Sequence, residues 1–231
     1  MNFIEIKDLT KIYEMGNKKI YAVNNVNLTV NKEEFIILFG PSGSGKTTLL
    51  LLLGGLIKPT SGSIIVEAQD ITKLNGSALV RWRQKNVGFI FQKINLIDFL
   101  DVYDNVIVPV VPFKRELNDN DTKKKALELI EKVGLKERIS HKPSQLSVGE
   151  QQRVAVARAL ITEPKIILAD EPTAHLDTET GKKIVELMKE LQKRFKSTFI
   201  VSTHDPELLN LADRIVKMRD GKLIAETYQG H

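Results

Sequence analysis

Short, mostly apolar runs dominate the first and last thirds of the chain. Apolar and polar positions that alternate with a period of two predict strands at residues 3–9 and 21–30. Runs typical of strands buried on both faces of a parallel sheet occur at residues 35–39, 87–91, 165–169 and 198–202. Helical patterns at 47–56 and 178–195 lie between them, so an α/β fold is expected, with helices covering both faces of the sheet.

The C-terminal segment and the middle of the chain show two further patterns. Residues 214–228 predict a hairpin, because Asp220-Gly221 is a strong tight-turn pair. Between 96 and 161 the apolar positions recur with a helical period, most clearly at 123–133 and 150–161. We therefore expect one domain, in which residues 1–95 and 162–231 form the core with its sheet and residues 96–161 form an inserted helical subdomain.

Composition agrees with one sizeable globular domain. The chain has 231 residues, of which 42% are hydrophobic and 27% are charged. Its net charge of +5 comes from lysines and arginines spread along the chain, so we expect a solvated surface and no nucleic-acid partner. The absence of cysteine excludes disulfides and thiol chemistry.

No segment of the sequence is predicted to insert into a membrane. The longest apolar run, residues 49–57, is far shorter than the roughly 20 residues that a spanning helix needs. The N-terminus lacks the basic region followed by an apolar stretch that marks a signal peptide. We expect a cytoplasmic protein that acts at a membrane only through a partner.

A glycine-rich stretch, GPSGSGKTT, separates the first buried strand from the following helix and matches the P-loop pattern G-x-x-x-x-G-K-[ST]. Glycines let the backbone curl so that successive N–H groups face one anion, and the helix adds its positive dipole end. Lys46 is expected to reach the β- and γ-phosphates of a nucleotide, and Thr47 to offer its hydroxyl to Mg²⁺. The predicted nucleotide-binding residues of this stretch are Gly40, Pro41, Ser42, Gly43, Ser44, Gly45, Lys46, Thr47 and Thr48.

Polar residues end three of the other buried strands. Asp170, in IILADEP, is placed to hold Mg²⁺ through its water shell, and Glu171 is the candidate base for the attacking water. Gln92 offers an amide to a metal-bound water and to a phosphate oxygen, and His204 is placed to hydrogen-bond the γ-phosphate. The candidate catalytic residues are Lys46, Gln92, Glu171 and His204, and the candidate metal ligands are Thr47, Gln92 and Asp170.

A second glycine-containing stretch, SQLSVGEQQR, precedes the helix at 150–161. The N–H groups of Ser147 and Gly149, with the dipole of that helix, form a second anion site. This site lies in the helical subdomain and not beside the P-loop, so we expect it to meet a nucleotide held by another copy. Two chains facing head to tail would enclose two ATP molecules.

Together these motifs resemble the nucleotide-binding subunit of ABC transporters over nearly the full chain. GPSGSGKT looks like Walker A, LSVGE like the signature, IILAD with Glu171 like Walker B and its glutamate, and AHLD like the D-loop. Gln92 and His204 look like the Q-loop and switch residues. The resemblance implies a P-loop NTPase (RecA-like) fold with an N-terminal antiparallel β subdomain, stacking of adenine on Tyr13, and nucleotide contacts by Ser147, Gly149 and Glu150.

The same resemblance implies a function. It predicts an ATPase that uses ATP and Mg²⁺, forms a homodimer around the nucleotides and drives transmembrane permease subunits that dock near residues 92–106. The stretches GNKKIYAVNNVNL and FIFQKINLIDFLDVYDNV are most similar to the group that serves lipoprotein release, macrolide export and cell division. Export or extraction from the membrane is therefore implied, with the chain at the inner face of the cell membrane.

Four positions depart from the family pattern. Val148 and Glu150 replace the second glycine and the glutamine of the usual signature, Glu33 stands where a glycine is customary, and His175 replaces a small or polar residue. Glu150 is expected to bring a negative charge toward the nucleotide and so to weaken closure of the dimer.

A P-loop also occurs in other classes of protein. An ATPase of DNA repair or chromosome organisation needs a long coiled coil between the Walker motifs, and a translation factor normally has two cassettes; neither feature is present in the sequence. A P-loop kinase needs an acceptor pocket and does not explain LSVGE. An ATPase that drives a signalling or cell-division membrane complex without moving cargo stays open.

Overall fold

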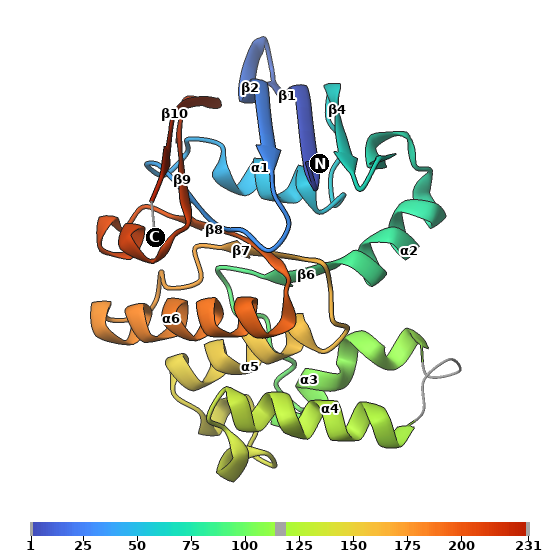
Figure 1. The fold of residues 1–231 in the computed structure, drawn as a ribbon, viewed down its shortest axis with the longest axis vertical. Coiled ribbons are helices and arrows are strands. Elements are labelled where there is room, and N and C mark those ends of the chain that lie inside the picture. Colours follow the sequence, from blue (N-terminus) through green and yellow to red (C-terminus); the bar gives the residue numbers. More distant parts are fainter. Residues whose placement is uncertain (1, 114–118, 230–231) are drawn as a thin grey trace.

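Two sheets form the scaffold of the computed structural model, which describes residues 2–113 and 119–229 (Figure 1). The first sheet is antiparallel, with the strand order β2-β1-β4-β5. Its strands are β1 (Ile4–Met15), β2 (Lys18–Val30), β4 (Ser61–Val66) and β5 (Gln69–Asp70). The antiparallel β subdomain expected at the N-terminus is therefore present, and its hairpin β1–β2 extends well beyond the short strands that the alternation predicted.

The second sheet has the strand order β10-β9-β3-β8-β7-β6. Its strands are β3 (Phe35–Phe39), β6 (Val87–Ile90), β7 (Ile166–Asp170), β8 (Thr198–Thr203), β9 (Arg214–Arg219) and β10 (Lys222–Tyr228). All neighbouring pairs are parallel except β9–β10. The expected C-terminal hairpin is confirmed: Asp220 and Gly221 have φ of 49° and 76°, as its tight turn requires.

The parallel sheet separates two hydrophobic cores. Along β3, Phe35 and Ile37 belong to one core, while Ile36 and Leu38 belong to the other, as the period of two along a strand dictates. The core on the side of the antiparallel sheet contains α1 (Lys46–Leu53), which Figure 1 shows between the two sheets.

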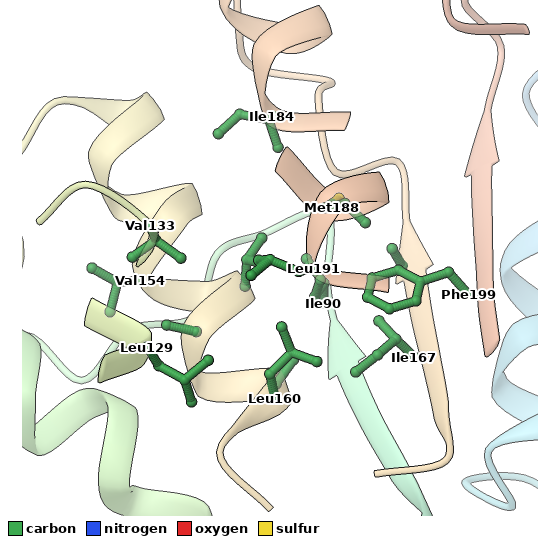
Figure 2. Close-up of a cluster of buried hydrophobic side chains, with 14 of the residues drawn as sticks. Ile90, Leu129, Val133, Val154, Leu160, Ile167, Ile184, Met188, Leu191 and Phe199 are labelled. Atoms are coloured by element: carbon green, nitrogen blue, oxygen red, sulfur yellow. The ribbon is translucent and has the colours of Figure 1, made fainter. Parts of the chain in front are cut away.

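The opposite core is formed by helices that pack on the other face of the sheet. Figure 2 shows Met188 and Leu191 of α6 (Thr178–Phe195) and Leu160 of α5 (Val148–Leu160) close to Phe199 and Ile167 of the sheet. The remaining helices of this half, α3 (Val102–Ile107) and α4 (Asp119–Lys132), pack against α5 and form the lowest layer in Figure 1. All three of α3, α4 and α5 fall within residues 96–161, but the domain boundaries themselves stay a prediction.

Three elements were not predicted: β4, β5 and α2 (Gly76–Asn86), whose N-cap Asn75 accepts a hydrogen bond from the backbone of Ala78. The helix expected at 47–56 is shorter because Gly54 and Gly55 follow Leu53, and Gly55 has a left-handed φ of +63°. Short 3₁₀ segments occur at Ile71–Lys73, Val108–Phe113, Lys136–Arg138, Pro143–Gln145 and Pro206–Leu211. Among the described residues, no helix combines the length and the apolar character required to cross a bilayer.

Candidate active site

The P-loop connects β3 to α1 and is shaped by its glycines. Gly43 and Gly45 have φ of +78° and +100°, in the left-handed region that side chains disfavour. A Cβ on Gly45 would lie 2.0 Å from the carbonyl oxygen of Ala22, whereas one on Gly43 would meet no atom within 4 Å. Gly45 is thus required by packing, and Gly43 leaves open space beside the loop.

A cleft of about 500 Å³ lies beside this loop. Its walls come from the P-loop, from the strand β2, from the turn between β9 and β10, and from two of the predicted catalytic positions. The lining residues are Ile20, Tyr21, Ala22, Ser42, Gly43, Gly45, Lys46, Thr47, Thr48, Gln92, Glu171, Asp220 and Gly221. The structure therefore brings Lys46, Gln92 and Glu171 together at one cleft.

Lys46 is the buried cation of this site, with only 4% of its side chain exposed. Its ammonium donates hydrogen bonds to the carbonyl oxygens of Gly40 and Pro41, at 2.8 and 3.0 Å. It also lies 3.4 Å from Oε1 of Glu171. A phosphate group that entered the cleft would meet an ammonium already held in place by the loop.

Thr47 and Asp170 form the oxygen-rich part of the site. The Thr47 hydroxyl donates to Oδ1 of Asp170 at 3.0 Å, although the two residues are 123 positions apart in the chain. Among the described residues, no group of three or more His, Cys, Asp or Glu side chains could hold a metal ion. The pair fits Mg²⁺, which is bound in nucleotide sites by one or two protein oxygens together with substrate phosphates and waters.

The Ser44 hydroxyl also fits a loop built around an anion. It is buried and has no hydrogen-bond partner in the part of the chain that the structure describes. Such an unsatisfied polar atom is costly unless a ligand or water completes its bonds.

Glu171 stands between two nitrogens. Its Oε2 lies 3.3 Å from Nδ1 of His204, whose side chain is 54% exposed, and its Oε1 faces Lys46. The backbone of Glu171 has a φ of 42°, unusual for a residue with a side chain, and its N–H donates to the Ser202 hydroxyl at 2.9 Å. The carboxylate is thus presented at the cleft by a constrained backbone directly after β7.

Tyr13 lies on the exposed end of the β1–β2 hairpin. It is 41% exposed and pairs with Ile20, a lining residue of the cleft. The Lys11 ammonium lies 5.2 Å from the centroid of its ring. Tyr13 does not itself line the cleft, but its cross-strand neighbour Ile20 does, so Tyr13 lies near the rim of the cleft.

The signature residues are in a different part of the molecule. Ser147 caps α5: its hydroxyl accepts from the N–H of Glu150 at 3.3 Å, and Glu150 Oε2 accepts from the Ser147 N–H at 2.8 Å and from its hydroxyl at 2.9 Å. A Cβ on Gly149 would lie 3.0 Å from Cγ2 of Thr180 in the first turn of α6. These hydrogen bonds stay within residues 147–150 and do not reach the P-loop.

Glu150, expected to bring a negative charge toward the nucleotide, has partners for its carboxylate within its own chain, and its effect on closure of the dimer stays a prediction. The carboxylate folds back on its own helix, and Oε1 lies 3.5 Å from Nε of Arg138. The Ser147 N–H, the Ser147 hydroxyl and the Arg138 charge lower the pKa of Glu150 below its usual value of 4.5. Arg138 was missed by sequence reasoning, since nothing in the local pattern of residues 136–138 relates it to the signature.

The other departures have local explanations. Glu33 has a φ of 59°, so it occupies a position suited to glycine, and its N–H donates to the hydroxyl of Thr198 at 2.9 Å. Val148 is 43% exposed at the first turn of α5, and His175 is exposed. None of the three displaces a residue that lines the cleft.

The fold and the cleft together define a P-loop ATPase. Residues 23–174 match the family model for the ABC transporter. The chain belongs to this family, as one of its ATP-binding cassettes.

Relatives and solved structures agree with this membership. An uncharacterised ABC transporter ATP-binding protein of Methanocaldococcus jannaschii is 43% identical over 225 residues, 96% of each chain. The lipoprotein-releasing system ATP-binding protein LolD of Pseudoalteromonas translucida is 42% identical, over 98% of this chain and 97% of that protein. The macrolide export ATP-binding/permease protein MacB of Hyphomonas neptunium is 42% identical over 97% of this chain, which spans only 34% of that longer protein. A solved dimeric cassette in a post-hydrolysis state with ADP and phosphate superposes with a TM-score of 0.89, at 41% identity, over 99% of this chain and all of that one.

Proposed function

We propose that this chain is the ATP-hydrolysing subunit of an ABC transporter, in which binding and hydrolysis of ATP drive a transmembrane permease. The observation that carries the proposal is that Lys46, Thr47 and Glu171 line one cleft, where Thr47 is hydrogen-bonded to Asp170, while the capped helix α5 does not line it. The lipoprotein-releasing and macrolide-export relatives favour a role in export or in extraction of a lipid-linked cargo from the membrane.

The residues of the cleft divide the work of hydrolysis. Lys46 binds the β- and γ-phosphates and stabilises the charge that develops on them in the transition state. Thr47 and Asp170 would hold Mg²⁺ together with bound ATP, and the ion would neutralise part of the phosphate charge. A bound phosphate competes with Glu171 for the Lys46 ammonium, which leaves the carboxylate able to act as a base.

Glu171 then accepts a proton from water while the water oxygen attacks the γ-phosphorus. The bond between that phosphorus and the β–γ bridging oxygen breaks, and the products are ADP and phosphate. His204, 3.3 Å from Glu171, orients this carboxylate and reaches toward the γ-phosphate. Gln92, which also lines the cleft, would offer its amide to the γ-phosphate and to the water shell of the ion, and Tyr13 would stack on the adenine.

A second copy completes the site. The Ser147 and Gly149 N–H groups at the start of α5 would cap the γ-phosphate held by the partner's P-loop in a head-to-tail homodimer. The dimer of the related cassette with ADP and phosphate supports this arrangement.

The permease is proposed to dock beside Gln92. A hollow of about 440 Å³ there is lined mainly by apolar side chains, among them Leu56, Phe89, Phe91 and Pro109. Phe99, in the segment that follows Gln92, is 76% exposed. Because Phe91 lines this hollow and Gln92 lines the nucleotide cleft, adjacent residues connect the two. The chain would then lie peripherally on the cytoplasmic face of the membrane through its permease.

Hydrolysis without an acceptor tests the enzyme. The purified chain should release phosphate from Mg²⁺–ATP, and Glu171→Gln should slow it by more than about a hundredfold, because the general base is lost. Lys183→Ala, an exposed change on α6, should leave the rate unchanged. Transfer of phosphate only in the presence of an acceptor would instead indicate a kinase.

Dimerisation and docking are tested separately. Glu171→Gln should form a dimer with Mg²⁺–ATP in sedimentation experiments, and persistence of the monomer at saturating ATP would contradict the scheme. Phe99→Ser should reduce association with membranes that contain the permease while retaining ATP hydrolysis. A complex that hydrolyses ATP and changes permease conformation but moves no cargo in vesicles would favour the signalling or cell-division alternative.

A further inference from the structure

Ser202 is a polar residue near the carboxyl end of a central strand whose middle, residues 199–201, is apolar. It is fully buried and lies on β8, between β3 and β7, opposite Leu38 and Asp170. Its neighbours Phe199 and Val201 belong to the core that contains α5 and α6, whereas Ile200 belongs to the core that contains α1. By the alternation along a strand, Ser202 shares the side of Ile200, where the P-loop helix lies.

The Ser202 hydroxyl has two partners, both in the site. It donates to Oδ1 of Asp170 at 2.7 Å, and it accepts from the backbone N–H of Glu171 at 2.9 Å. The same Oδ1 accepts from the Thr47 hydroxyl at 3.0 Å. A continuous set of hydrogen bonds therefore runs from the P-loop helix through the Asp170 carboxylate to the backbone of the catalytic base.

We propose that Ser202 is a positioning residue that fixes the Asp170 carboxylate and the Glu171 backbone at the same time. This inference rests on the proposed ATPase function and deepens it. Ser202 does not line the cleft, so it acts through the two acidic residues.

The backbone conformation of Glu171 explains why such a device is needed. Its φ of 42° is sparsely populated by residues with a side chain, so it persists only where surrounding contacts hold it. The bond from the Glu171 N–H to Ser202 is the contact that orients the peptide unit between Asp170 and Glu171. A buried apolar residue at 202 would leave this N–H without its partner and would remove one of the two hydroxyl donors to Asp170.

Ser197 provides a matched control on the same segment. It is also a buried serine, and its hydroxyl donates to the carbonyl oxygen of Pro164 at 2.6 Å. Pro164 precedes the amino end of β7, whereas the site is at its carboxyl end. Ser197→Ala therefore removes a similar buried hydrogen bond without touching the acidic residues.

The experiment compares Ser202→Ala with Ser197→Ala in the full chain. Binding of a fluorescent, non-hydrolysable ATP analogue is measured by titration in two conditions, in the presence of Mg²⁺ and in EDTA. Ser202→Ala should weaken Mg²⁺-dependent binding by roughly tenfold, the scale on which loss of a residue behind a metal ligand acts, and should leave binding in EDTA within about twofold of wild type. Its kcat should fall by roughly 10- to 100-fold, whereas Ser197→Ala should change neither quantity.

A graded variant covers the case in which the alanine variant does not fold. Ser202→Cys preserves the size of the side chain but is a weaker hydrogen-bond donor, and it adds the only cysteine to the chain. It should show an intermediate loss of Mg²⁺-dependent binding. Ser202 variants that match wild type, or that lose only stability as Ser197→Ala does, would overturn the proposal.

The outcome is separable from that of the proposed function. Absence of hydrolysis by the wild-type chain would count against the ATPase, but the Mg²⁺-dependent affinity is measured without hydrolysis. Equal affinities of wild type and Ser202→Ala for the analogue in Mg²⁺ would contradict the proposed role of Ser202, even if the wild-type chain hydrolyses ATP.

Discussion

The carboxylate of Glu150 and the guanidinium of Arg138 lie 3.5 Å apart at the start of α5, where the signature begins. This pairing changes the effect that the charge of Glu150 is expected to have on a nucleotide. An anion that would oppose the phosphates of a nucleotide is held by its own helix and balanced by a cation from the segment Lys136–Arg138. The Arg138 Nη1 also lies 3.1 Å from His141 Nε2, so the arginine is held from two sides.

This pairing predicts a charge-dependent effect on dimer formation. In the Glu171→Gln background, Arg138→Ala should weaken ATP-dependent dimerisation by up to about fivefold, since half-exposed ion pairs are worth at most about 1 kcal/mol. In Glu150→Gln there is no carboxylate for Arg138 to balance. The double variant should therefore dimerise as strongly as Glu150→Gln alone. Sedimentation equilibrium with Mg²⁺–ATP measures all three.

Lys136→Ala is the matched control, because Lys136 lies on the same 3₁₀ segment but pairs with Glu131 at 2.8 Å. It should leave dimerisation unchanged. If Arg138→Ala weakens dimerisation equally whether position 150 is Glu or Gln, the result would show that Arg138 contacts the nucleotide directly.

The capping role of Glu150 predicts a pH dependence of stability. Its pKa is lowered in the folded chain, so its contribution is complete above the unfolded value of about 4.5 and is lost as the pH falls through the folded value. Glu150→Gln should therefore be less stable than wild type at pH 7, by no more than about 1 kcal/mol, and the difference should be smaller at pH 3. Urea unfolding at the two pH values measures the difference; a gap that stays constant with pH would contradict this origin.

The two left-handed glycines of the P-loop should respond differently to alanine. Gly45→Ala places a Cβ 2.0 Å from the Ala22 oxygen and should destabilise the chain by about 3 kcal/mol or more. Gly43→Ala meets no atom within 4 Å and should cost about 1 kcal/mol, from its φ of +78° alone, while its new methyl group obstructs the phosphate. Thermal melts and ATP titrations should thus separate a stability defect from a binding defect, and similar melting points for the two variants would refute the distinction.

Replacement of Arg214, which does not line the nucleotide cleft, is expected to cause a large loss of stability. Only 2% of its side chain is exposed; its Nη1 donates to the Thr29 carbonyl at 2.7 Å and lies 3.5 Å from Glu34, and its Nη2 pairs with Glu226. Arg214→Ala leaves Glu34, 8% exposed, without this cation and should lower the free energy of unfolding by about 3–5 kcal/mol. Denaturant unfolding measures this, and the exposed Arg219→Ala should change it by less than about 0.5 kcal/mol.

Much of the parallel sheet was predictable from the sequence because buried parallel strands are apolar on both faces. The runs at 35–39 and 198–202 match β3 and most of β8, and the amphipathic pattern at 178–195 matches α6. In contrast, α2 buries only Trp82, so its helical period is weak in the sequence, and it depends on its Asn75 cap. The outer halves of β1 and β2 are largely exposed and are ordered by pairing with each other, which alternation of hydrophobicity does not report.

The sequence by itself determined the local chemistry: the glycines that permit the P-loop backbone, the serine that caps α5 and the acidic residues that end β7. These depend on neighbours within a few positions, so their signals are short and readable. Only the tertiary structure decided that Thr47 meets Asp170 across 123 residues, that Ser202 holds both acidic residues, and that Arg138 balances Glu150. The physical reason is that strand order and helix packing bring together residues distant in the chain, and each such contact depends on the position of the whole element and not on the residues beside it.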